Sequence, residues 1–380
     1  MTISTEPLYK QIYDQLRKDI QAGKYKSSQR LPTEKELCQM YHVSRITSKK
    51  ALNMLAEENL VIRIKGKGSY INRNQNGINR QPLNDKKMPV IGVIMSVFDS
   101  SYGRELLAAI EENCRQKNVL CLFSRTLGDQ QAEGRALDNF ISYGVDGIII
   151  MPVHGMYYNA KILQLVLDGF PIVVVDSDLK NVPTHFVGSD NLFAAQQAMD
   201  YLLHTGHKKI GIFTPSYKDT LSVEDRIEGA RRSLQKHNIH LESAPIFTED
   251  LDTASIYSCD ETFARDRAVV IEYLEKNSDM TAAFAINYKT ALLLKSAIEE
   301  LGRSIPEDFS IVCFDSPIME IPSTYFFTHI QQREEEVGTR AFDLLCALIQ
   351  GELEERTTKI EIPARLIIGS STKSITHTIE

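Results

Sequence analysis

The chain has 380 residues, 43% of them hydrophobic and 24% charged, which is typical of a folded protein with two or three domains. No apolar run reaches the roughly 18 residues that a membrane-spanning helix needs, and the first ten residues lack the pattern of a secretory signal. The net charge of −7 is unevenly divided, because residues 1–82 carry 15 Lys and Arg against 7 Asp and Glu, which predicts a basic module for a polyanion joined to an acidic module.

Three short helices are predicted in the first sixty residues. The first has an apolar residue at every fourth position, at Leu8, Ile12, Leu16 and Ile20. Thr33 and Glu36 have the spacing of a capping box, which starts a second helix. Ser44 is an N-cap candidate for a third helix, whose apolar positions are Ile46, Ala51, Leu52 and Leu55. Two short helices joined by a tight turn, the second basic at its start, indicate a helix-turn-helix.

A small hairpin is predicted next, with strands at 60–64 and 69–71 on either side of the turn sequence KGKG. Lysines and glycines at such a tip can approach phosphates or the minor groove. On the third helix we expect Arg45 to read guanine, because its planar fork matches two acceptors in the major groove. Ser44 and Thr47 are expected to bond phosphate at the helix N-terminus, and Lys49 can take either role.

These 65 residues resemble the winged helix-turn-helix of GntR-type bacterial transcription regulators, in the elements PLY-QI, LPTE-EL, VSR-T--KAL and GKGSYI. The resemblance implies a DNA-binding domain at residues 1–71, with double-stranded operator DNA as its partner. It adds Lys35, where the family commonly has Arg, and the wing glycine. The expected DNA-binding set is Lys35, Ser44, Arg45, Thr47, Lys49, Lys65, Gly66 and Lys67. A solvated surface charge is the alternative for Lys50, Lys65 and Lys67.

The rest of the chain predicts a linker followed by an α/β unit. Residues 72–88 are polar, rich in Asn and without periodicity, as in an exposed linker. Residues 89–380 alternate apolar runs with amphipathic stretches, which predicts a doubly wound parallel sheet. The series restarts near Lys208, so we expect two similar lobes. The apolar runs lie at 90–96, 119–124, 147–152, 171–177, 208–214, 281–287 and 309–315.

In such sheets ligands bind outside the carboxyl ends of the strands. The side chains that follow the apolar runs include Phe98, Tyr102, His154, Asp176, Asn287 and Asp315. Carboxylates and amides can bond the hydroxyls of a sugar, and an aromatic face can stack on its ring. A phosphate ligand would call for convergent cations or a glycine-rich loop, and neither GxGxxG nor GxxxxGK[ST] occurs. The pattern therefore predicts a cleft for a neutral sugar, with no cofactor.

This half is similar to the effector domain of LacI-type repressors, itself related to periplasmic sugar-binding proteins, in YLLHTGHKKIGIFTP, VEDRIEGARRSLQKHNI, TAAFAIN, IPEDFSIVCFDS and THIQQREEEVG. The resemblance implies that Arg226, Asn287, Asp315 and Gln332 line the cleft from the second lobe. The first lobe contributes Asp176 and the loop from Phe98 to Tyr102. With His154, the expected effector-binding set is Phe98, Tyr102, His154, Asp176, Arg226, Asn287, Asp315 and Gln332.

A GntR reader joined to a LacI-type sensor is the arrangement of arabinose-responsive repressors. We therefore predict a cytoplasmic, homodimeric repressor of carbohydrate-use genes that a neutral sugar such as arabinose releases from DNA. The closer rival is a regulator of the same architecture with a nucleoside, purine or amino acid as effector. An enzyme that uses Asp176 and Asp315 as paired carboxylates is a further alternative, against which the attached DNA reader argues.

Structural roles are the alternative for four positions: an ion pair to Asp225 or Glu224 for Arg226, a helix cap for Asp315 and for Asp190, and a loop position for His154. The pair His204 and His207 lacks an acidic or thiol partner, which argues against a metal site. The six cysteines are scattered without a CxxC pair, which favours reduced thiols over a disulfide frame or a zinc site.

Overall fold

The chain divides into two compact units, Met1–Lys87 and Met88–Glu380. The structure is a computed structural model that describes residues 7–22, 24–25, 30–58, 60–64, 68–71, 88–96, 98–99, 101–153, 158–214, 220–240, 244–249, 251, 260–317, 325–353 and 357–375. The expected site residues Lys65, Gly66, Lys67 and His154 lie outside the described residues, as does the predicted linker before Met88. Among the described residues, no helix has the length and apolar character needed to cross a membrane.

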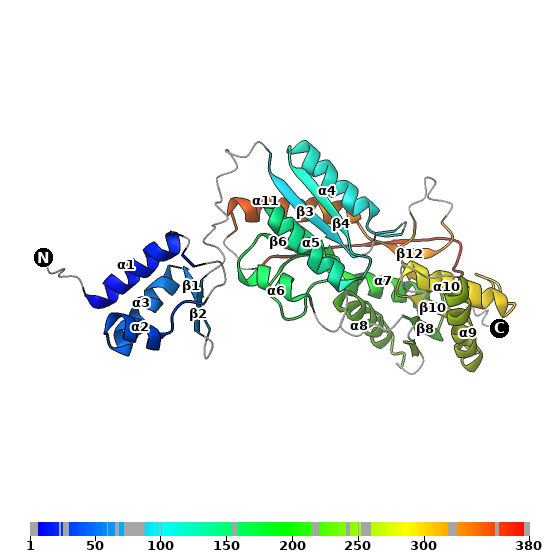
Figure 1. The fold of residues 1–380 in the computed structure, drawn as a ribbon. Helices are drawn as coiled ribbons and strands as arrows, with labels where there is room; N and C mark the ends of the chain where they lie inside the picture. The colour runs from blue at the N-terminus through cyan, green and yellow to red at the C-terminus, as the bar shows by residue number, and fades with distance from the viewer. Residues whose placement is uncertain are drawn as a thin grey trace, which may run out of the picture. The chain divides into compact units, whose positions relative to one another are not determined.

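The first unit packs three helices against a two-stranded antiparallel hairpin (Figure 1). The elements are α1 (Leu8–Gln21), α2 (Glu34–Tyr41), α3 (Arg45–Glu57), β1 (Val61–Ile64) and β2 (Gly68–Ile71). The predicted capping box is formed, because Thr33 Oγ1 accepts from the Glu36 amide at 3.2 Å and the Glu36 carboxylate accepts from the Thr33 amide at 2.6 Å. Ser44 is the N-cap of α3 and accepts from the Thr47 amide, as predicted.

One predicted core position of α3 is wrong, since Ile46 is 81% exposed. The buried stripe of this helix is instead Ser48, Ala51, Leu52 and Leu55, at helical spacings of three and four residues. Ile46 lies off that stripe and faces solvent. Ser48 is tolerated inside because its hydroxyl donates to the carbonyl oxygen of Arg45 at 3.1 Å.

The first lobe of the second unit has a parallel six-stranded sheet in the order β13-β7-β6-β5-β3-β4. Its strands are β3 (Val90–Met95), β4 (Leu120–Arg125), β5 (Gly147–Met151), β6 (Ile172–Val175), β7 (His185–Ser189) and β13 (Lys359–Ile362). One face packs on α4 (Arg104–Gln116) and α11 (Glu334–Gln350), and the other on α5 (Gln130–Tyr143) and α6 (Ala160–Leu167).

The second lobe repeats this plan in the order β14-β12-β11-β10-β8-β9. Its strands are β8 (Ile210–Phe213), β9 (Ile246–Phe247), β10 (Ala282–Ala285), β11 (Ser310–Phe314), β12 (Thr328–Gln331) and β14 (Arg365–Ile367), of which β14 runs antiparallel. Helices α7 (Asn191–His204) and α8 (Leu221–Lys236) cover one face. Helices α9 (Asp260–Lys276) and α10 (Tyr288–Glu300) cover the other. The predicted doubly wound α/β fold is confirmed.

The chain passes between the two sheets three times: from β7 to α7, from β12 to α11 and from β13 to β14. The strand series restarts near Lys208 as predicted, because β8 (Ile210–Phe213) is the first strand of the second sheet in chain order. The crossings themselves were not predicted: α7 before β8 already belongs to the second lobe, and α11 and β13 return to the first lobe. Each passage takes only one or two residues beyond the elements it joins. Apart from Pro363 between β13 and β14, these short joins lack the Gly and Pro residues by which connections are recognised in a sequence.

Candidate functional site

Three of the predicted DNA-binding residues carry exposed positive charge on α2 and α3, namely Lys35, Arg45 and Lys49. The Arg45 side chain is 82% exposed, and its Nε lies 3.0 Å from the carboxylate of Glu34. Ser44 Oγ lies 2.8 Å from Thr47 Oγ1, so both hydroxyls are at the N-terminus of α3. This end of α3 combines the backbone amides of its first turn, hydroxyls and a cation, which suits contact with a nucleic-acid backbone and base edges.

Two neighbours on α3 have roles that sequence reasoning did not assign. Ile46 is exposed between Arg45 and Lys49 and presents an apolar side chain on the same helix end. Lys50 points the other way, with its Nζ 3.8 Å from the centre of the Tyr9 ring. This cation–π contact ties α3 to α1, so the structure gives Lys50 a packing role.

The effector-cleft candidates centre on two aspartates, each of which follows a strand of one lobe. Asp176 follows β6 and Asp315 follows β11, and both adopt left-handed backbone angles, with φ of 72° and 63°. Left-handed non-glycine residues are uncommon and concentrate at ligand sites. Burial raises the pKa of the Tyr102 hydroxyl well above its usual value, and the nearby Asp176 and Asp315 carboxylates raise it further. Tyr102, Asp176 and Asp315 therefore lie close together.

Asp315 is held by residues of the second lobe and of the crossover. Its carboxylate accepts a hydrogen bond of 2.9 Å from Gln332 Nε2, and both side chains are buried. Burial raises the pKa of Asp315 to about 7, with a smaller contribution from the Asp176 and Asp99 carboxylates, while Arg226 and Gln332 act in the opposite direction. With its pKa raised toward neutrality, this carboxyl group can accept hydrogen bonds when ionised and also donate one when protonated.

Arg226 is buried and contacts several elements of the second lobe. Its Nε donates to Asn191 Oδ1 at 2.8 Å, and its Nη1 donates to the carbonyl oxygen of Ile286 at 2.9 Å. The guanidinium carbon lies 3.8 Å from the centre of the Phe314 ring. These contacts join α8, α7, β11 and the end of β10. Among the described residues, the ion pairs do not include one between Arg226 and Asp225 or Glu224, and Glu224 pairs with Lys180 at 3.0 Å.

Three other candidate residues have packing or capping contacts. The Asn287 side-chain oxygen caps α10, accepting from the amide and from the hydroxyl of Thr290, both at 2.9 Å. Phe98 is half-buried against the first-lobe core, with its ring 5.9 Å from that of Phe123. Asp190 caps α7 by accepting from the Phe193 amide at 2.9 Å. The described cleft residues that the structure brings together are thus Tyr102, Asp176, Arg226, Asp315 and Gln332.

Contacts between the two lobes were not predicted from the sequence. Lys289 Nζ of the second lobe lies 3.7 Å from Asp99 Oδ2 of the first. The Ser222 amide donates to Ser177 Oγ at 3.3 Å. The Lys180–Glu224 ion pair also joins the lobes. No local pattern marks these residues, because each pair is at least 44 positions apart.

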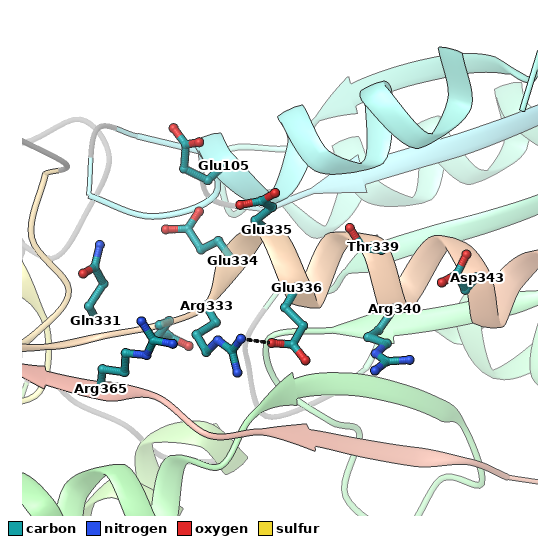
Figure 2. A pocket seen from close by; sticks show the side chains of 11 residues that line it. Glu105, Gln331, Arg333, Glu334, Glu335, Glu336, Thr339, Arg340, Asp343 and Arg365 are labelled. Atoms are coloured by element: carbon teal, nitrogen blue, oxygen red, sulfur yellow. Dashed lines mark ion pairs between the residues drawn. The ribbon is translucent and has the colours of Figure 1, made fainter. Parts of the chain in front are cut away.

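Glu334, the first residue of α11, was also missed. It is buried, and its carboxylate accepts from the amides of Gly103 at 2.7 Å and Leu106 at 3.4 Å. Burial and the nearby Asp315 carboxylate raise the pKa of Glu334 to about 7. Figure 2 shows the open pocket beside it, which has a volume of about 670 Å³ and contains the ion pair of Arg333 with Glu336 at 2.7 Å. Its lining is Glu105, Gln331, Gln332, Arg333, Glu334, Glu335, Glu336, Thr339, Arg340, Asp343 and Arg365.

The histidines of HTGH make structural contacts. His207 is buried, with Nδ1 3.0 Å from Thr281 Oγ1 and Nε2 3.3 Å from the carbonyl oxygen of Lys373. His204 is exposed at the end of α7. Within the described ranges, no three His, Cys, Asp or Glu side chains gather in a group that could hold a metal ion.

Comparison with known proteins assigns families to both units. Residues 91–353 match the model of the periplasmic binding protein domain, and residues 8–71 match that of bacterial regulatory proteins of the gntR family. The Arabinose metabolism transcriptional repressor of Geobacillus stearothermophilus is 27% identical over 380 residues, which covers 99% of this chain and 100% of that protein. The HTH-type transcriptional repressor PurR of Mannheimia succiniciproducens is 27% identical over 289 residues, or 75% of this chain and 81% of that repressor.

Solved structures agree with the fold. The transcription regulator CcpA of Lactococcus lactis has a TM-score of 0.64 and 25% identity, over 76% of this chain and 100% of that one. The Lac repressor bound to ONPG has a TM-score of 0.61 at 22% identity, over 87% and 92% of the two chains, and so supports the fold alone. The relatives named here are transcription regulators, so the predictions of a GntR-type reader with a LacI-type sensor, and of a regulator rather than an enzyme, are confirmed.

Proposed function

This chain belongs to the periplasmic binding protein domain family and is a DNA-binding transcriptional repressor, and on that premise we propose that a neutral sugar, with arabinose as first candidate, releases it from its operator. The proposal assigns DNA binding to residues 1–71, sugar sensing and dimerisation to residues 89–380, and linker to the residues between them. Its main support is the hydrogen-bonded pair of Asp315 and Gln332, buried at the carboxyl end of β11 beside Asp176 and Tyr102.

This arrangement suits a polyol. Carboxylates and an amide can accept from and donate to several hydroxyls, and the tyrosine offers an apolar face. The one cation near Asp315 that we assign to the cleft, Arg226, already donates to Asn191 and to Ile286. A phosphate would meet at least two carboxylates at this position, and like charges repel. We therefore place sugar hydroxyls on Asp176, Asp315 and Gln332.

The DNA-reading face in this proposal is the start of α3. Arg45 bonds guanine, Ser44 and Thr47 bond phosphate, and Lys35 and Lys49 add positive charge. We add Ile46, whose exposed side chain suits a thymine methyl group. The wing residues Lys65, Gly66 and Lys67 stay in the proposal on the strength of their sequence pattern.

A homodimer is proposed because β4 is an edge strand of the first-lobe sheet in the described part of the chain and carries exposed apolar side chains. Leu120 and Phe123 on this strand are 40% and 43% exposed. Tyr143, at the end of α5, is 63% exposed. A second copy that covers this edge would remove an exposed strand and pair two DNA readers on a two-fold symmetric operator. Sedimentation of the wild type and of Phe123→Glu tests it, with a dimer and a weakened dimer expected.

The rival effector is a purine, favoured by the similarity to the repressors named PurR. Both effectors are distinguished by the unfolding midpoint of the full chain against pentoses, hexoses, disaccharides, sugar phosphates and purines. At about 100 times its dissociation constant, an effector stabilises the fold by about 2.7 kcal/mol, which raises the midpoint by a few degrees. A shift with one neutral sugar supports the proposal, and a shift with purines or phosphorylated compounds alone overturns it.

A further inference from the structure

Helix α4 lacks a cap of its own. Its N-cap residue is Gly103, with a φ of 94°, which has no side chain to accept from the amides of the first turn. Glu334 supplies the missing acceptor from 231 residues further along the chain, bonding the amides of Gly103 and Leu106. These are the backbone donors that an N-cap side chain normally satisfies, so the carboxylate of Glu334 is the cap of α4.

Glu334 also lies on a crossover between the lobes. It is the first residue of α11 and comes two residues after Gln332, whose amide is bonded to Asp315. In this short segment, Gln332 is therefore bonded to the second lobe and Glu334 is bonded to helix α4 of the first lobe. Figure 2 shows Glu334 reaching from the start of α11 toward the start of α4, where Glu105 lies.

Tight packing makes α4 follow this segment. Gly338, one turn further along α11, lies so close to α4 that a Cβ atom there would be 2.6 Å from the carbonyl oxygen of Leu106. The two helices are therefore in close contact at this point. A displacement of the start of α11 is therefore passed to α4, because the Glu334 bonds and this packing hold the two helices together.

The ionisation of the Glu334 carboxyl group depends on the charge of Asp315. The groups that face the Glu334 carboxyl are the Asp315 and Glu105 carboxylates, the Tyr102 hydroxyl and the two α4 amides. Asp315 raises the pKa of Glu334, whereas the amides lower it. An ionised cap also interacts favourably with the positive end of the α4 dipole. A change of charge at Asp315 therefore changes the ionisation of Glu334, which bonds the amides of the first turn of α4.

We propose that Glu334 is the positioning residue that transmits occupancy of the cleft, sensed at Asp315 and Gln332, to helix α4 of the first lobe. The identity of the ligand rests on the proposed function. The coupling between Asp315 and the α4 cap does not, and it can be measured without any ligand.

Hydrogen exchange of the Gly103 and Leu106 amides in the full chain tests the coupling. We expect Asp315→Asn to slow this exchange at pH 7 by about threefold or more, because Glu334 then ionises more readily and caps more firmly. In a Glu334→Gln background the same substitution should have no effect. Glu335→Gln, an exposed carboxylate next in the chain, is the matched control and should leave the response to Asp315→Asn intact. Unfolding midpoints check that all variants fold.

Two results overturn the proposal: exchange that is unchanged by Asp315→Asn, or a change of equal size in the Glu334→Gln background. With L-arabinose as the probe, Glu334→Gln should bind within about threefold of the wild type. The factor by which the sugar weakens operator binding should fall by about fivefold or more. If arabinose binds neither protein, the proposed effector is wrong, and the exchange data alone decide the role of Glu334.

Discussion

Gln332, on the crossover from β12 to α11, donates a hydrogen bond of 2.9 Å to the carboxylate of Asp315 at the end of β11. Both side chains are more than nine-tenths buried, at 7% and 9% exposure. The pair joins the proposed sugar site to a segment that connects the two lobes. A ligand that bonds Asp315 would therefore bond a residue held directly by the crossover between the lobes.

Replacing Asp315 by Asn separates sugar binding from stability. The variant keeps the shape of the side chain but loses an acceptor and the buried charge. We expect sugar affinity to fall by about tenfold or more, equivalent to about 1.4 kcal/mol, as titration calorimetry would measure. The free energy of unfolding at pH 8 should stay equal or rise, because a buried carboxylate no longer has to ionise. Weaker binding together with a large loss of stability would mean that Asp315 is structural.

Stability should fall as the pH rises from about 4 to 8. Asp315 and Glu334 have pKa values raised to about 7, so the folded state holds protons that the unfolded state has already released. Their contribution is complete below pH 4 and is lost as the pH passes 7. The pKa is raised by about 3 for Asp315 and by about 2.5 for Glu334, so at about 1.4 kcal/mol per pKa unit the pair accounts for at most on the order of 8 kcal/mol of the stability difference between pH 4 and pH 8.

Urea unfolding of the wild type at several pH values measures that slope. The double variant Asp315→Asn, Glu334→Gln should have a flatter profile, and Glu335→Gln should match the wild type. If the profiles of the wild type and of the double variant stay parallel between pH 4 and 8, Asp315 and Glu334 are not the source of the fall in stability.

Arg226 is expected to hold the second lobe together. Arg226→Met removes donors to Asn191 and to the Ile286 carbonyl, leaving buried acceptors unpaired. We expect a loss of about 2–4 kcal/mol in the free energy of unfolding. Arg226→Lys restores the charge but not the planar fork over Phe314, so only part of that loss should return. Full recovery in the lysine variant would show that charge alone matters at this position.

Ile46 should discriminate thymine from uracil. If its side chain contacts a thymine methyl group, operators with single deoxyuridine substitutions should identify one base whose methyl contributes about 1 kcal/mol to the wild type and nothing to Ile46→Ala. Lys50→Ala is the control, since Lys50 packs on Tyr9, and it should respond to deoxyuridine like the wild type. Equal sensitivity of the wild type and Ile46→Ala at every position would contradict this role.

Features with a local cause could be predicted from the sequence. The capping box of Thr33 and Glu36, the Ser44 cap and the aspartates that follow β6 and β11 all depend on neighbours in the chain. The position of Ile46 could not be fixed, because one residue of shift in the stripe decides whether it faces core or solvent. The role of Glu334 left no local mark, since its partners lie 228 and 231 residues away. The lobe crossings were missed for the same reason.

The most direct test of the account is the affinity of the full chain for an operator selected from random duplexes, measured at fixed salt with and without L-arabinose. A coupling of about 1–3 kcal/mol predicts that the sugar weakens binding by about 5–150-fold. An operator affinity that stays constant with every effector the protein binds would contradict the account.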